Sequence, residues 1–325
     1  MHEKMILRFL FFYGKINVVL KSTLHVFYFF YFSEVTMSSF IISTDSTCDL
    51  PYEFIKENDV LIQPLQYTTG DQIFHDGPTT DLKKFYDNMR SGVTYKTNAS
   101  NPVDVSNSFR PFLEKGIDIL HIAFSSGLSC SYANTQLAVN DLSEEFPERK
   151  IVSVDSLAAS MGQGLIVYYA CKLKREGASF DEIADWVREN ALHTCHQFTV
   201  DDLKYLMRGG RVSKVSWLLG TLINIKPVLH VDDEGHLIPL AKVRGRKKSL
   251  ISLVDNMEQS IGSYRDKNEI VLISHADCLE DAQFVGNLVT ERFGITNIVY
   301  NYINTVIGSH SGPGTVALFF LGDKR

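Results

Sequence analysis

Short apolar runs alternate with longer amphipathic segments along the first half of the chain. The apolar runs predict buried strands at residues 40–44, 117–123 and 151–154. The second and third runs are each followed by a polar loop and then by helical spacing of apolar residues, over 132–142 and 160–175. Alternating strands and helices predict an α/β fold, with a mostly parallel sheet that carries helices on both faces.

Polar side chains collect where these predicted strands end. The first strand leads into Asp45–Pro51, the second into Ser125–Ser129, and the third into Asp155–Ser156. A further polar segment, Thr97–Pro102, precedes another predicted helix. One loop hydroxyl usually caps a helix, but ligands bind such sheets beyond the carboxyl ends of the strands. Several converging polar loops therefore favour a site for an anion.

The second half of the chain begins with a basic stretch interrupted by glycines, Phe198–Leu250. Leu203 and Leu206 predict a short helix after Asp201 that stops at Gly209–Gly210. The stretch continues with a predicted helix at 215–222 and a hairpin of strands at 228–231 and 237–243, turned by residues 232–235. Beyond it we expect helices at 250–263 and 278–293, and strands at 269–274, 298–303 and 315–321. These elements predict a second α/β domain that contains a β-hairpin.

Three parts of the chain are expected: an N-terminal extension (1–36), an N-terminal α/β domain (38–197) and a C-terminal α/β domain (198–325). The helix predicted at 181–193 ends the first domain, and the linker is expected near Thr194–Phe198. The extension is rich in Phe and Tyr, but charged residues interrupt it, and no uncharged stretch approaches the ~20 residues of a membrane-spanning helix. Because Met37 directly precedes the first strand, we interpret the extension as dispensable or as an upstream start, with membrane anchoring as the alternative.

Charge is distributed unevenly between the basic stretch and the rest of the chain. Residues 201–250 hold ten Lys or Arg and five Asp or Glu, a local charge of +5 in a chain of 325 residues with formal net charge −6. Such a surface attracts phosphate, carboxylate or an acidic partner, although many charge runs are only solvated faces. Because the cations lie near glycines, we favour a binding role for Arg211, Arg244 and Arg246.

Composition places the chain among ordinary soluble globular proteins, with 45% hydrophobic and 22% charged residues. The five cysteines are scattered without a CxxC pair, which fits a reducing cytoplasm. His193, Cys195 and His196 match no standard zinc spacing, so no metal site is expected. Gly162-Gln163-Gly164 lacks the full dinucleotide-binding pattern.

A glycine-rich segment, residues 307–314, surrounds His310 and predicts a rigid loop in which the imidazole contacts a ligand. A serine of the segment 125–129, together with His310 and an aspartate such as Asp45, would supply the residue types of a hydrolase triad. The GxSxG pattern is missing. A serine hydrolase or another enzyme acting on a small acid therefore remains the alternative interpretation.

Six segments together resemble the DegV family of bacterial fatty-acid-binding proteins. They are DSTCDLP (45–51), SSGLS (125–129), VDS (154–156), FTVDDLKYLMRGGRVS (198–213), KPVL (226–229) and HSGPGTV (310–316). They occur in the family's order and span nearly everything from Phe40 onward. Six ordered segments are a far more specific signal than any one of them.

The resemblance implies two α/β domains and one long-chain fatty acid held in an internal tunnel. It implies that the protein is not an enzyme but the lipid-binding subunit of bacterial fatty acid kinase, which presents the carboxylate to a separate ATP-dependent subunit for acyl phosphate formation. No cofactor, nucleic acid or stable membrane insertion is expected, and the protein would be cytoplasmic.

The resemblance also assigns site residues. The carboxylate contacts fall on Thr97, Ser126, Ser129 and His310, and Arg211 follows from the RGGR sequence. Two segments depart from the family pattern: TSQPSP is replaced by TNASNP at 97–102, and SGT by Ser129-Cys130-Ser131. Thr97 and Ser129 are retained, while Cys130 in place of glycine is a change that can narrow the entrance.

Overall fold

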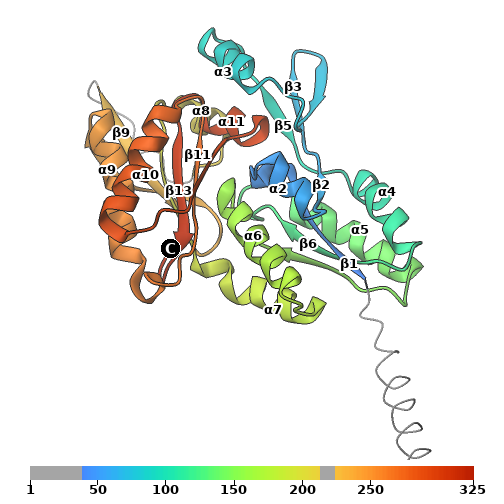
Figure 1. Ribbon diagram of the computed structural model, residues 1–325. Coiled ribbons are helices and arrows are strands. Elements are labelled where there is room, and N and C mark those ends of the chain that lie inside the picture. The colour runs from blue at the N-terminus through green and yellow to red at the C-terminus, as the bar shows by residue number, and fades with distance from the viewer. Residues whose placement is uncertain (1–38, 213–223) are drawn as a thin grey trace, which may run out of the picture. The chain divides into compact units, whose positions relative to one another are not determined.

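A four-stranded parallel sheet organises the first half of the chain in the computed structural model, which describes residues 39–212 and 224–325 (Figure 1). Its strand order is β2-β1-β6-β7, with all neighbours parallel. The strands are β1 (Phe40–Asp45), β2 (Leu61–Gln63), β6 (Asp118–Ala123) and β7 (Ile151–Asp155). The three strands expected from their apolar runs are confirmed, and β2 joins them at one edge.

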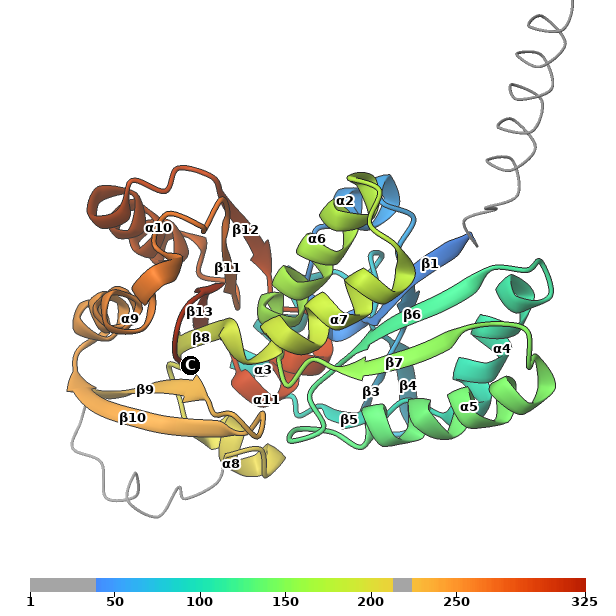
Figure 2. The same cartoon turned by 90° about the horizontal axis from the view of Figure 1, so that it is seen from below.

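Alternate residues of these strands face two different cores. Ile119 and Ile151 pack against α4 (Pro102–Leu113) and α5 (Ser131–Glu145). Leu120 and Ile122 face the opposite side, which α6 (Met161–Arg175) and α7 (Phe180–Asn190) cover. This alternation places helices on both faces of the sheet, as Figure 2 shows.

A six-stranded mixed sheet organises the second half, in the order β10-β9-β8-β13-β11-β12. Its strands are β8 (Thr194–Thr199), β9 (Ile225–Val231), β10 (Leu237–Arg244), β11 (Val271–His275), β12 (Ile298–Tyr302) and β13 (Val316–Leu321). Only the β11–β12 pair is parallel. The hairpin of β9 and β10 is confirmed. Helices α9 (Arg246–Ser260) and α10 (Leu279–Phe293) pack on one face of this sheet.

Helix α6 lies between the two sheets, and two glycines let it approach both of them. A Cβ at Gly162 would overlap the ring of His196 on β8. A Cβ at Gly164 would overlap the carbonyl of Cys48 in the 3-10 turn η1 (Ser46–Cys48). Helix packing therefore accounts for the two glycines of the Gly-Gln-Gly sequence, without a dinucleotide site.

A third sheet and several short elements complete the fold. A three-stranded antiparallel sheet has the order β4-β3-β5. The elements are β3 (Gln66–Thr69), β4 (Gln72–His75), β5 (Lys96–Asn98), α2 (Tyr52–Glu57), α3 (Leu82–Arg90), α8 (Lys204–Gly209) and α11 (Thr305–Ser311), with 3-10 turns η2 (Ala191–His193) and η4 (Gly262–Tyr264). Helix α8 ends as expected at Gly210, which has a φ of 67°.

Three expectations are corrected. The segment predicted as a linker, Thr194–Phe198, belongs to the buried strand β8. The segment around His310, predicted as a loop, is helix α11. Helix α9 begins at Arg246, four residues before the expected start at residue 250. The domain limits stay a prediction, and residues 1–36 and the helix at 215–222 lie outside the described residues.

The carboxylate that ends β1 is buried and gives the fold a measurable pH dependence. Asp45 Oδ2 accepts the backbone N–H of Phe124 at 2.7 Å. Burial raises the pKa of this carboxyl from its ordinary value of 3.8 to about 7. Between about pH 4 and pH 7 the folded state therefore keeps a proton that the unfolded state has released, and the associated stability is lost as the pH rises through about 7.

We expect Asp45→Asn to remove this pH dependence. Between pH 6 and pH 8 the free energy of unfolding of the parental protein should fall by about 1.4 kcal/mol relative to the variant, because one pKa unit corresponds to that energy. Urea unfolding at the two pH values measures the difference, with the exposed Asp266→Asn as the control. Parallel pH profiles of parent and Asp45→Asn would contradict the assignment.

Candidate ligand pocket

A pocket opens at the carboxyl end of β6, where the parallel sheet faces β8 and β13. It holds about 820 Å³ of space including its open mouth. Most of its lining is apolar: Leu65, Ala99, Phe124, Leu128, Ala159, Phe198, Leu206, Val231, Leu237, Ile303, Val306, Ile307, Ala317 and Phe319. Such walls fit a long apolar ligand.

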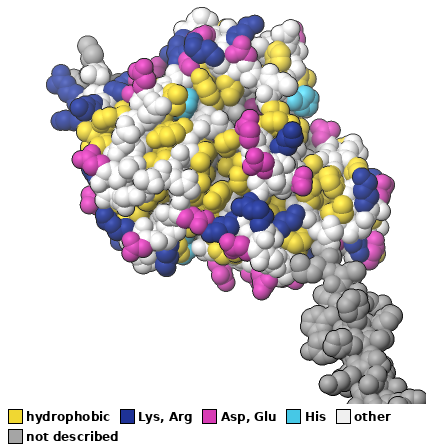
Figure 3. Space-filling model, viewed as in Figure 1, with side chains coloured by type: hydrophobic (Ala, Val, Ile, Leu, Met, Phe, Trp, Pro, Cys, Tyr) yellow, Lys and Arg dark blue, Asp and Glu magenta, His cyan; other side chains and the backbone are white. Residues whose placement is uncertain are grey.

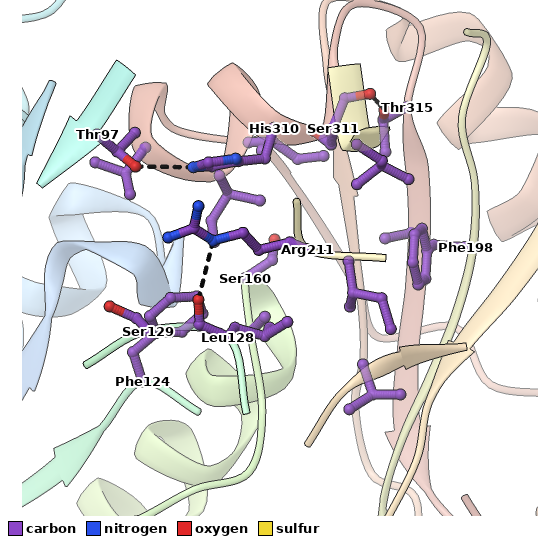
Figure 4. Close-up of a pocket in the computed structure, with 18 of the residues that line it drawn as sticks. Thr97, Phe124, Leu128, Ser129, Ser160, Phe198, Arg211, His310, Ser311 and Thr315 are labelled. Carbon is purple, nitrogen blue, oxygen red and sulfur yellow. Dashed lines mark hydrogen bonds between the residues drawn. The ribbon is translucent and has the colours of Figure 1, made fainter. Parts of the chain in front are cut away.

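Polar side chains gather at one side of this pocket (Figure 4). Thr97 comes from β5, Ser129 from the loop before α5, His310 from the last turn of α11, and Arg211 from just after α8. Thr97 Oγ1 lies 2.8 Å from His310 Nε2. Residues that are 213 positions apart in the sequence thus form one hydrogen-bonded pair.

His310 is held as a neutral imidazole. Burial, followed by the nearby charge of Arg211, lowers the pKa of His310 from 6.5 to about 4. Its Nδ1 atom has no hydrogen-bond partner among the described residues and lies where a Cβ at Gly209 would overlap it. At neutral pH the ring therefore carries one proton and can donate one hydrogen bond.

A side chain at position 209 should displace His310. The Cβ of Gly209→Ala would overlap His310 Nδ1, so the ring must move and lose its contact with Thr97. We expect the pKa of His310 to rise from about 4 toward its ordinary 6.5 as the ring becomes more solvated, which NMR titration of the imidazole measures. The control is Gly77→Ala, whose Cβ would meet no atom within 4 Å. An unchanged titration in Gly209→Ala would show that Gly209 does not determine the position of the ring.

The Ser125–Ser129 loop is fixed from several sides. Ser125 Oγ donates a hydrogen bond to the carbonyl of Gly235 at 2.9 Å. A Cβ at Gly127 would overlap the carbonyls of Glu234 and Gly235, so the hairpin turn packs directly on this loop. The N–H of Ser126 bonds Asp155 at 3.2 Å. The turn that joins β9 to β10 thereby helps to position the loop that carries Ser129.

The two serines expected at the carboxylate site have different positions. Ser129 lines the pocket, and its Oγ lies 2.9 Å from Ser131 Oγ. Ser126 is exposed and is not among the residues that line the pocket. The structure therefore brings Thr97, Ser129 and His310 together but not Ser126.

The three arginines expected to face a partner also separate. Arg211 is exposed and lines the pocket, with Nε donating to the carbonyl of Leu128 at 3.2 Å. Arg244 is exposed at the end of β10. Arg246 is partly buried, pairs with Asp281 at 2.8 Å and donates to the carbonyl of Gly314 at 2.5 Å. Its guanidinium anchors α9, which leaves Arg211 and Arg244 as the accessible cations of the three.

Three side chains that sequence reasoning did not assign hold the segment leading into α11. Asp49 accepts the N–H of Asn304 at 3.0 Å. Asp76 accepts both the N–H and the hydroxyl of Thr305, at 3.1 and 2.6 Å. The hydroxyl of Tyr86 donates to the carbonyl of Ile303 at 2.6 Å. These contacts fix the helix that presents His310, and only Asp49, within the DSTCDLP segment, had a sequence signal.

The residues considered for a hydrolase or a zinc site are engaged elsewhere. His310 Nε2 contacts Thr97 instead of a serine, and Asp45 bonds the backbone of Phe124. The possible zinc ligands bond backbone carbonyls: His193 to Gly322, Cys195 to Lys324 and His196 to Thr194. Within residues 39–212 and 224–325, no group of three His, Cys, Asp or Glu side chains is arranged to hold a metal ion.

Comparison with known proteins places these features in a family. A family model described as an uncharacterised protein of the DegV family matches residues 39–323. A DegV domain-containing protein of Clostridium perfringens is 41% identical over 291 residues, which cover 89% of this chain and 99% of the relative. No helix in the described part of this chain has the length and apolar character needed to cross a bilayer.

Solved structures share the fold. One is described as fatty acid binding of a DegV family protein from Thermus thermophilus; it is 26% identical, with a TM-score of 0.74, over 87% of this chain and 99% of the other. The Fatty Acid Kinase (Fak) B3 protein of Streptococcus pneumoniae, loaded with linoleic acid, is 24% identical, with a TM-score of 0.76, over 88% of this chain and all of the other. At 24% identity, the second similarity concerns the fold alone.

Proposed function

This chain belongs to the DegV family, and on that premise we propose that it binds one long-chain fatty acid in the pocket, with the carboxylate at Thr97, Ser129 and His310. DegV relatives bind fatty acids. The observation that carries the proposal is the hydrogen-bonded pair of Thr97 and His310 at one side of an otherwise apolar pocket. An acyl chain needs the apolar walls, and its charged head group needs hydrogen-bond donors where it leaves water.

The proposed donors to the carboxylate are neutral side chains, and the carboxylate does not form an ion pair with a buried cation. In the tautomer that carries its proton on Nε2, the neutral His310 ring donates to Thr97 Oγ1, and the Thr97 hydroxyl proton is then free to donate to the carboxylate. Ser129 provides a second hydroxyl, since either member of the Ser129–Ser131 pair can be the donor between them. Arg211 at the pocket lining adds a favourable positive charge.

We further propose that the protein presents the bound acid to an ATP-dependent kinase subunit and does not catalyse the transfer itself. A carboxylate oxygen attacks the γ-phosphorus of ATP held by that subunit, ADP leaves, and the acyl phosphate forms. The proposal takes this role from the Fatty Acid Kinase (Fak) B3 protein of Streptococcus pneumoniae, which shares the fold of this chain. Arg211 is both exposed and at the pocket, so it can face the transferring phosphoryl group.

The accessible cations outside the pocket are proposed to dock the kinase subunit. Lys and Arg side chains gather at the upper left of Figure 3, over β9 and α9, whereas elsewhere on that face they alternate with Asp and Glu. Arg244 at the end of β10 and Lys247 in the first turn of α9 are both exposed. Such a surface fits an acidic partner surface and speeds association. Arg246 is left out of this role because its guanidinium is already paired with Asp281.

The double variant Arg244→Ala/Lys247→Ala should keep its bound lipid but lose phosphorylation. In a reconstituted assay with kinase subunit and ATP at low salt, we expect acyl phosphate formation to fall about three- to tenfold. Added salt should lower the parental rate toward that of the variant, because ions screen exposed charges. The control Arg188→Ala changes an exposed arginine on α7. A parallel loss of lipid would place the two residues at the pocket, and unchanged phosphorylation would refute docking.

A further inference from the structure

One hydroxyl on the pocket wall has no hydrogen-bond partner among the described residues. Ser311 lines the pocket and is only 6% exposed, and its Oγ atom is left unpaired. The neighbouring hydroxyls of the same wall are paired: Thr315 donates to the carbonyls of Ser311 and Gly312, and Ser160 to the carboxylate of Asp49. Ser311 is thus the exception in this part of the pocket.

The helix itself does not account for this exception. A serine in a helix commonly bonds the carbonyl four residues earlier, and Ser309 in the same helix does so, with Oγ 2.7 Å from the carbonyl of Thr305. Ser311 makes no such bond. Buried hydroxyls without partners are rare because they lose their hydrogen bonds to water without replacement. A plain acyl chain beside Ser311 would offer only C–H groups and would leave the hydroxyl unpaired.

The position of Ser311 indicates where along a ligand its partner must lie. Ser311 follows His310 in α11, so their Cα atoms are about 3.8 Å apart. In Figure 4, Ser311 lies toward Thr315 and Phe198, on the side away from Thr97 and Ser129. An acid with its carboxylate at Thr97 and His310 would therefore pass Ser311 within the half of its chain nearest the carboxylate.

We propose that the pocket is adapted to a long-chain fatty acid that carries an oxygen substituent, a hydroxyl or a keto group, in the carboxylate-proximal half of its chain. The oxygen accepts a hydrogen bond from Ser311 Oγ. This inference rests on the proposed function, because it takes the orientation of the acid from the Thr97–His310 site. It adds a selectivity among acids that the apolar walls alone do not provide.

The test uses delipidated full-length protein and competition against a fluorescent fatty acid. Hexadecanoic acid is compared with a positional series of monohydroxyhexadecanoic acids, from C2 to C8, and with the 16-hydroxy isomer. We expect at least one proximal isomer to bind the parental protein about five- to tenfold more tightly than hexadecanoic acid, a gain typical of one hydrogen bond. Ser311→Ala should abolish this preference while it retains the affinity for hexadecanoic acid.

Two controls separate this inference from the proposed function. Ser309→Ala removes a hydroxyl from the same helix that is already bonded to Thr305, and it should keep the preference. The affinity of the 16-hydroxy isomer relative to that of hexadecanoic acid should be the same for the parental protein and for Ser311→Ala. If hexadecanoic acid binds, but every proximal isomer keeps its affinity relative to hexadecanoic acid in Ser311→Ala, the inference is overturned and the proposed function stands. If hexadecanoic acid itself does not bind the parental protein, both are overturned.

Discussion

Ala317→Phe is expected to lower the affinity for long-chain fatty acids by at least about 100-fold. Ala317 lies on β13, is 5% exposed and lines the pocket next to Phe198, its partner across the β8–β13 ladder. A phenyl ring there occupies space that the acyl chain needs. Each methylene group kept out of the pocket forfeits about 0.8 kcal/mol, so excluding four or more of them exceeds the 100-fold loss.

Fluorescence competition with hexadecanoic acid measures this loss, and thermal unfolding checks that the variant is folded. The matched control is Ala133→Phe, the same substitution at an exposed position of α5. If Ala317→Phe folds and binds hexadecanoic acid like the parent, the acyl chain lies outside this pocket.

Thr97→Val should weaken acid binding by about 10- to 150-fold. Valine keeps the shape of threonine but removes the hydroxyl that we place between His310 and the carboxylate, and a hydrogen bond to a charged group contributes roughly 1.5–3 kcal/mol. Ser129→Ala and His310→Ala should act in the same direction. Binding of the methyl ester of hexadecanoic acid should change little, because the ester has no charged carboxylate that accepts a hydrogen bond from Thr97.

Thr94→Val is the control for this series, since Thr94 is exposed and outside the pocket lining. Isothermal titration of acid and ester against each variant separates a head-group effect from a general loss of the pocket. Equal losses for acid and ester would indicate a damaged pocket, and parental affinity in Thr97→Val, Ser129→Ala and His310→Ala would place the carboxylate elsewhere.

The sequence predicts the long elements well because their apolar residues follow the period of the element. It fails at β8, where four of six residues, Thr194, His196, Gln197 and Thr199, are polar and yet buried. Their burial depends on partners far away in the chain, such as the carbonyl of Pro227 for Thr199. No local pattern carries that information, so the segment resembles a linker.

The error at α11 has a different cause. Glycines at 308, 312 and 314 are typical of a loop, but Gly308 lies within a helix where a Cβ would overlap the hydroxyl of Tyr86. A glycine selected for close packing is indistinguishable in sequence from one selected for a turn. The strands β3, β4 and β5 were not predicted because runs of three or four residues are too short to show a period.

The candidate site was assigned from the family resemblance and from the structure together. Family resemblance assigned Thr97, Ser129 and His310, and the structure gathers these three around one pocket. It also assigned Ser126, which is three residues from Ser129 but is exposed and does not line the pocket. Residue type and neighbourhood in sequence do not determine side-chain direction in a loop.

Native mass spectrometry of the full-length protein tests the central claim most directly. Protein purified from a bacterial host without added lipid should carry about one equivalent of a long-chain acid, roughly C14 to C18, as expected for a pocket that encloses a single ligand. The bound species should be released as a free carboxylic acid on denaturation, and Ala317→Phe should be purified without it. Parental protein that is empty as purified, and that gains no mass when hexadecanoic acid is added, would contradict fatty acid binding.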